Sequence, residues 1–242
     1  MLRMLLFIGL LISPALLMAQ DLPAGIALPV MLNSGIDANK VASGATIKAR
    51  LMQDVILPSG VRIRAGATVL GNIVEVNPPG TGSGSRVAVR FDRLAFHKST
   101  LHFSSHLRAL ASMNEVFEAW LPTNAIDDYG TSTADWNTVQ VGGNEVVYRG
   151  NGTVMSASGV VGNASIGGDV QAPLQPVRSG GCHGGANPQA LWVFSTTACG
   201  VYGYDDITIA HWGRTNPVGD IVLVSKGKLR VQSGSGLLLI AN

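Results

Sequence analysis

Alternating apolar and polar residues predict short strands in the part of the chain that follows residue 21. In residues 46–51, with the sequence TIKARL, every second side chain is apolar from Ile47 onward. A period of two is that of a half-buried β-strand. The alternation recurs in residues 86–91 and 100–108, and residues 69–76 form another apolar stretch. In residues 100–108 it places Leu101 and Phe103 on one face and His102, Ser104, His106 and Arg108 on the other, polar outer face. Several short strands at this spacing predict a barrel or a sandwich.

One short helix is predicted at residues 113–120. Ser112 and Glu115 have the spacing of a capping box, in which the serine side chain accepts a hydrogen bond from the backbone three residues on. Pro122 requires the helix to end before it, because the residue preceding a proline disfavours helical backbone angles.

Beyond this helix the pattern changes twice. Residues 121–190 are polar, rich in glycine and irregular, with residues 139–147 and 154–161 as the best strand candidates. Strand-like apolar runs return after residue 190, and the chain closes on the apolar run 237–240. We therefore expect the C-terminus to be buried as a strand.

The aromatic residues suggest two structural units. All four tryptophans and all four tyrosines lie after residue 119. The predicted fold class is mainly β: an N-terminal barrel- or sandwich-like unit at residues 22–111, and a second, Gly-rich and aromatic-bearing β unit at residues 151–242. Residues 112–150 would supply the helix and an irregular connection.

The first nineteen residues resemble a cleavable signal peptide. Arg3 precedes an apolar run over residues 5–17, and Ala19 stands before a polar pair. A membrane anchor is the alternative, but the run is shorter than a spanning helix needs and contains Pro14. No later stretch is long enough to cross a membrane as a helix. The sequence thus predicts a soluble protein, periplasmic or extracellular.

Composition and charge narrow the classes of partner. The chain has 242 residues, of which 46% are hydrophobic and 13% charged, and its net charge is +2. Low charge with many apolar residues argues against intrinsic disorder. A near-neutral chain gives no reason to expect nucleic acid or an anionic membrane as a partner.

The two cysteines fit an oxidising compartment. Cys182 and Cys199 are the only cysteines, and a disulfide between them is the predicted state of an exported chain. Two alternatives remain open at this point: a metal site formed by Cys182, His183 and Cys199, or a pair of free thiols.

Residues 43–94 carry a resemblance to a known family. The order is a glycine and a strand in SGATIKARL, a second glycine-led strand in AGATVLGNIVEV, and a third strand ending in Phe-Asp-Arg-Leu. This order resembles the C-terminal β-barrel domain of type IV secretion and conjugation proteins of the VirB10/TrbI kind. The matching positions are Gly44, Ile47, Leu51, Gly66, Leu70, Gly71, Arg86, Arg93 and Leu94.

The resemblance covers about a fifth of the chain, and it implies a shared barrel-like unit and no catalytic residue. The membrane helix and the long proline-rich linker of that family have no counterpart here. The whole chain also resembles secreted bacterial proteins of unknown function.

No catalytic or cofactor motif is recognised in the sequence. His97, His102 and His106 form the densest histidine cluster, but in a strand the last two would lie about 13 Å apart, too far to share one metal ion. Glu115 with Glu118, and the pairs Asp127–Asp128 and Asp205–Asp206, are better explained as caps and turns than as catalytic or calcium-binding carboxylates. We therefore predict a non-enzymatic protein that uses no metal or cofactor.

Aromatic residues are the remaining candidates for binding. Trp136, Trp212, Tyr202 and Tyr204 could form a platform on which a sugar or a partner stacks. The alternative is that their rings fill a second core. In alternation, Trp212 falls on the face opposite Ile207 and Ile209.

Taken together, these patterns predict a secreted or periplasmic protein of envelope assembly or protein–protein contact. Strand edges and the glycine-rich loop at residues 78–85 would be contact sites, with another envelope protein or a second copy as the partner. A carbohydrate- or peptidoglycan-binding module is the alternative, and a secreted hydrolase is a third, weaker one.

Overall fold

The computed structural model describes most of the chain after residue 19. The described residues are 20–80, 84–121, 135–143, 145–149, 152–157, 159–164, 170–178, 181–190, 193–210 and 219–242. The predicted signal peptide at residues 1–19, the centre of the glycine-rich loop and Trp212 lie outside them. Within them the protein is mainly β, as the sequence predicts, with one short helix, α1 (Met113–Trp120).

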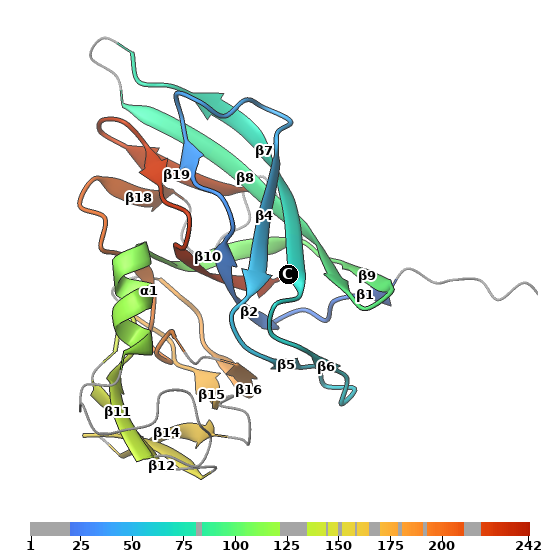
Figure 1. Ribbon diagram of the computed structural model, residues 1–242, viewed down its shortest axis with the longest axis vertical. Coiled ribbons are helices and arrows are strands. Elements are labelled where there is room, and N and C mark those ends of the chain that lie inside the picture. Colours follow the sequence, from blue (N-terminus) through green and yellow to red (C-terminus); the bar gives the residue numbers. More distant parts are fainter. Residues whose placement is uncertain are drawn as a thin grey trace, which may run out of the picture.

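Two sheets account for most of the strands (Figure 1). The large sheet contains β1 (Gln20–Asp21), β2 (Ala27–Leu32), β4 (Thr46–Leu51), β7 (Thr68–Asn77), β8 (Ser85–Phe96), β9 (Ser99–His102), β10 (Ser105–Ala111), β17 (Gly200–Tyr202), β18 (Ile207–Ala210), β19 (Ile221–Ser225) and β21 (Gly236–Ala241). The second sheet contains β11 (Asp135–Val139), β12 (Glu145–Arg149), β13 (Thr153–Ser156), β14 (Gly159–Ala164), β15 (Val170–Leu174) and β16 (Gly185–Ala190). Two small pairs join β3 (Ile36–Asp37) to β20 (Arg230–Val231), and β5 (Val55–Ile56) to β6 (Arg62–Ile63).

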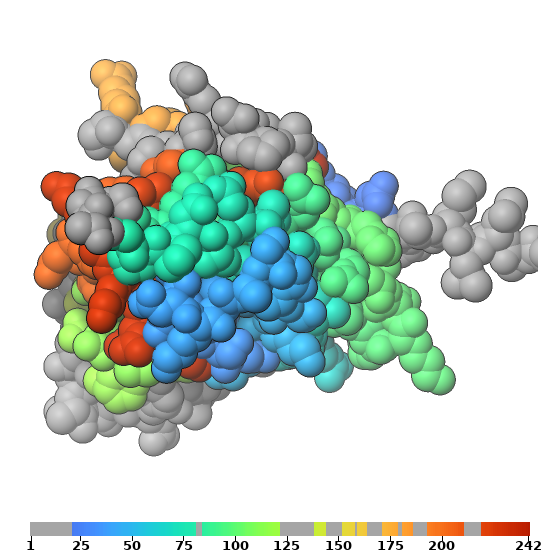
Figure 2. Space-filling model, turned by 90° about the horizontal axis from the view of Figure 1, so that it is seen from above, coloured from blue at the N-terminus to red at the C-terminus, as the bar shows by residue number. Residues whose placement is uncertain are grey.

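The C-terminal strand lies in the middle of the large sheet. The order along the sheet is β1-β9-β8-β7-β4-β2-β21-β10-β17, and all six residues of β21 are buried. This confirms the predicted burial of the C-terminal run. In Figure 2, atoms from the last part of the chain lie beside atoms from its first third. Within the sheet, β21 pairs with β2.

The boundaries between the two sheets fall at other positions in the chain than those predicted from the distribution of aromatic residues. Apart from β20, which pairs with β3, the strands from residue 200 onward pair within the large sheet, and the second sheet is formed by residues 135–190.

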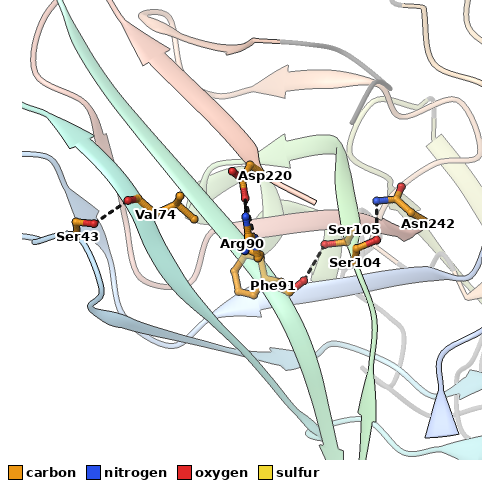
Figure 3. A network of polar contacts seen from close by, with 8 residues as sticks. All are labelled: Ser43, Val74, Arg90, Phe91, Ser104, Ser105, Asp220 and Asn242. Atoms are coloured by element: carbon orange, nitrogen blue, oxygen red, sulfur yellow. Dashed lines mark hydrogen bonds and ion pairs between the residues drawn. The ribbon is translucent and has the colours of Figure 1, made fainter. Parts of the chain in front are cut away.

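Strand β8 carries a seam where strand pairing is interrupted. Its first residues pair with β19 and its last residues pair with β9, so residues 90–92 lie between the two partners. There the carbonyl of Phe91 accepts a hydrogen bond from the Ser105 hydroxyl at 3.4 Å, while Arg90 is bound to Asp220 at 2.8 Å (Figure 3). The Phe103 backbone N–H also donates to the Asp92 carbonyl at 3.1 Å, so side-chain contacts and one backbone hydrogen bond together bridge this seam.

The large sheet buries both of its faces, but over different strands. Its inner face forms the main core, which contains Leu28, Ile47, Phe91 and Leu239. On the outer face, β2, β21 and β10 pack through Leu238 and neighbouring residues against α1 and part of the second sheet. The outer face of β4 is exposed, with a strict alternation of exposed and buried residues.

The helix has the predicted bounds and the predicted cap. The Ser112 side chain accepts a hydrogen bond from the Glu115 backbone N–H at 3.3 Å, and the helix ends at Trp120.

Three predicted strands are each interrupted. Residues 100–108 divide between β9 and β10, which pair with different neighbours. Residues 139–147 and 154–161 each span the turn of a hairpin, β11–β12 and β13–β14 respectively. Apolar patterning did not show these interruptions, because small and polar residues occur in the strands as well as between them.

Candidate functional site

A bulge in β10 turns Arg108 from the predicted exposed face into the protein. The pairing of β10 with β21 shifts between Leu107 and Ala109, so Leu107 packs in the main core and Ala109 in the core behind α1. An extra residue in one strand re-aims the side chains beside it. Arg108 is consequently only 2% exposed. The sequence alternation that grouped Arg108 with the exposed polar residues His102 and His106 was wrong at this position.

Four backbone carbonyls surround the Arg108 guanidinium. Nε donates to Ala198 at 2.9 Å, Nη2 donates to Gln175 at 2.5 Å and to Thr196 at 3.3 Å, and Nη1 donates to His183. Burial lowers the pKa of Arg108 from its ordinary value, because the charged form loses hydration. The carbonyl dipoles replace that hydration, so this side chain joins the large sheet to the segments around the second sheet.

The disulfide lies at the same junction, where Arg108 joins the large sheet to the segments around the second sheet. Cys182 and Cys199 are bonded, with their Cα atoms 6.2 Å apart, which confirms the predicted pairing and excludes a metal site or free thiols formed by these two residues. Cys182 is followed in the chain by His183, and Cys199 is preceded by Ala198. Both of these neighbours accept a hydrogen bond from Arg108 through their backbone carbonyls. The Cys182 sulfur also lies 3.8 Å from the Arg108 carbonyl oxygen.

Both tyrosines proposed as ligand-binding residues have hydroxyls engaged within the fold. The Tyr202 hydroxyl accepts from the Cys199 N–H at 2.9 Å and donates to the Cys199 carbonyl at 3.1 Å. The Tyr204 hydroxyl lies 2.6 Å from Ser235 Oγ and accepts from the Gln232 N–H at 3.1 Å. These contacts position loops and leave the proposed stacking role untested.

The two tryptophans of the same hypothesis are not brought to these tyrosines by any described contact. The backbone of Trp136 lies in β11, opposite Tyr148. Trp212 lies outside the described residues. A glycan platform therefore stays a prediction.

Helix α1 presents an apolar stripe to solvent. Val116 and Ala119 face the core, whereas Met113, Phe117 and Leu121 are 44%, 60% and 42% exposed. Met113 and Phe117 are four residues apart in α1, so they share one side of the helix, and Leu121 is the C-cap residue that follows its end. We call Met113, Phe117 and Leu121 the α1 stripe.

Charge is distributed unevenly between the two sheets, a feature that the net charge of +2 conceals. Residues 112–206, which include α1 and the second sheet, contain nine acidic residues and two arginines. Residues 22–111 and 207–242, which form most of the large sheet, contain fourteen Lys and Arg and five acidic residues. Counting charge by segment would have revealed this separation from the sequence alone.

The clefts among the described residues are open to solvent. One, of about 330 Å³, is lined by Asp37, Lys40 and Arg230 among others. Asp37 binds Arg230 at 3.1 Å, and the Asn39 backbone N–H is the main cause that lowers the pKa of the Asp37 carboxyl. In the part of the chain that the structure describes, no group of three His, Cys, Asp or Glu side chains could hold a metal ion.

Comparisons with protein-family models, with curated proteins and with solved structures find no match for this chain. The resemblance to type IV secretion proteins accordingly stays a prediction. Among the described residues, no helix has the length and apolar character needed to span a membrane.

Proposed function

We propose that this is an exported, non-enzymatic protein that makes protein–protein contacts in assembly of the cell envelope. The observation that carries the proposal is the α1 stripe, a set of large, exposed apolar side chains on α1 and at its C-cap, α1 being the only helix of the described residues. The leader-like first nineteen residues and the disulfide support export, since disulfides persist in oxidising compartments.

The α1 stripe differs from the single apolar residues that are commonly exposed on protein surfaces. Single exposed apolar residues are ordinary, whereas contiguous ones mark contact sites. Phe117 is more exposed than any other residue of the helix's apolar set, and burying a phenylalanine is worth about 1.5–3 kcal/mol. A rigid helix that offers Phe117 between Met113 and Leu121 has the i, i+4 anchor spacing by which helices dock into grooves.

Site-specific photo-crosslinking in living cells tests the proposal. With a photoreactive amino acid in place of Phe117, we expect a discrete crosslinked protein product, because a contact surface is occupied in the envelope. Val61 is the matched control, since it is apolar and 44% exposed but lies in the turn between β5 and β6. Crosslinks of equal yield from both positions, or none from Phe117, would contradict the proposal.

A further inference from the structure

We propose that the partner of the α1 stripe is a second copy of this chain, bound head-to-tail through the exposed outer face of β4. This inference rests on the proposed contact function and names its partner. The acidic helix region of one copy would lie on the basic sheet face of the next. The segment charges supply the argument for a second copy: one chain contains both a strongly acidic and a strongly basic part, and each complements the other.

The basic surface is built by strand alternation. Lys48 and Arg50 project from the exposed side of β4, and within the described residues neither forms an ion pair with a carboxylate. Across the sheet, Lys48 lies opposite Leu70, which in turn lies opposite Arg93. Paired residues of neighbouring strands share a face. We call Lys48, Arg50, Leu70 and Arg93 the β4 face.

The β4 face and the α1 stripe have matching chemistry. The β4 face contains Lys48, Arg50 and Arg93 around the aliphatic side chain of Leu70, which is partly buried; Arg93 is ion-paired with Asp92 at 3.0 Å, so among the described residues of this face Lys48 and Arg50 supply the unpaired charge. The α1 stripe contains Phe117 beside the exposed carboxylate of Glu118, and no basic residue lies in the last turn of the helix. An apolar contact ringed by opposite charges is the arrangement expected of a specific interface.

The geometry favours a chain of copies over a symmetric pair. If two α1 stripes met face to face, Glu115 and Glu118 of both copies would repel each other; two β4 faces would likewise oppose Lys48 and Arg50. Contact between unlike surfaces is heterologous and produces a ring or a filament. One helix on one strand pair is small beside a standard interface of about 1,200–2,000 Å², so the association should be weak and strengthened by low salt.

Complementing variants test this arrangement. The first variant combines Lys48→Glu with Arg50→Glu, and the second combines Phe117→Ser with Glu118→Lys. We expect each alone to weaken self-association about tenfold or more, because it converts attraction into repulsion at one surface. Mixed together they should form dimers and nothing larger, since each copy retains one intact surface. Sedimentation velocity at low salt measures the species.

Matched controls separate these effects from general charge and folding changes. Lys226→Glu with Lys228→Glu reverses two exposed charges with the same spacing elsewhere in the large-sheet segment, and Val160→Ser removes an apolar side chain as exposed as Phe117. Both control variants should associate like the parent. Thermal unfolding of every variant reveals loss of fold, and Lys48→Glu alone replaces the first variant if the loss of the contact between Arg50 and the Met31 sulfur unfolds it.

The outcomes distinguish this inference from the proposed function. A parent protein that stays monomeric at low salt and high concentration, or a mixture that contains no dimer, overturns the head-to-tail inference. If Phe117 nevertheless crosslinks to a different protein, the contact function survives without it. A dimer formed by either variant alone would show a symmetric interface and would also overturn the inference.

Discussion

Replacing Arg108 with methionine is expected to lower the free energy of unfolding by about 3–5 kcal/mol, the loss typical of a broken buried polar network. Methionine retains much of the apolar stem and removes the donors for four carbonyls. Replacing a complete buried ion pair with apolar groups can be nearly neutral. Here the Ala198 carbonyl stays buried and the other three stay partly buried after their shared donor is lost, so their lost hydration is no longer compensated. Arg108→Lys should lose less, because an ammonium keeps the charge but cannot span four acceptors.

Urea unfolding of the oxidised protein measures this effect. The control is Arg64→Met, which removes an exposed arginine from the loop that follows β6 and should change the free energy of unfolding by less than about 0.5 kcal/mol. If Arg108→Met were as stable as the parent, the junction would not depend on the guanidinium.

Removing the disulfide is the second change with a large expected effect. The bond joins residues 17 apart, for which chain entropy gives about 3 kcal/mol of stabilisation. The double variant Cys182→Ala/Cys199→Ala should therefore unfold at a lower temperature than the parent, by calorimetry without reductant. Adding reductant should lower the parent's unfolding temperature toward that of the variant and leave the variant's own unchanged.

The two effects should not add. Both cysteines adjoin carbonyl partners of Arg108, and neighbouring residues in one network couple. Combining Arg108→Met with the cysteine double variant should cost less than the sum of the separate losses. Strict additivity would contradict the view that the disulfide and the arginine stabilise the same junction.

The sequence predicted local structure well where one signal dominated. The alternation of residues 46–51 predicted β4, and Ser112 with Glu115 predicted the start of α1, because each depends on neighbours a few residues apart. The position of β21 between β2 and β10 could not be predicted this way. An apolar run shows that a strand is buried but does not name its partners.

The junction was hidden from sequence reasoning for a different reason. A bulge shifts the alternation of β10 by one residue. An arginine at position 108 is not a residue type that indicates a bulge. The arginine therefore fell on the polar side of an apparently regular strand. The disulfide was predictable because two lone cysteines in a chain predicted to be exported leave few alternatives.

The candidate surfaces could be predicted only in part from the sequence. Phe117 was within the predicted helix, but which side of the helix faces the core depends on packing against the large sheet. The segment charges were available from the start, and summing them over the whole chain cancelled the signal.

The measurement that tests the central claim most directly is the native mass of the purified protein by light scattering, at low and at high salt. The contact model with a second copy predicts a mass well above that of one chain, which is 25.2 kDa with all 242 residues present, at low salt, falling toward one chain as salt screens the opposed charges. A single-chain mass under both conditions, at the highest concentration reached, would contradict self-assembly.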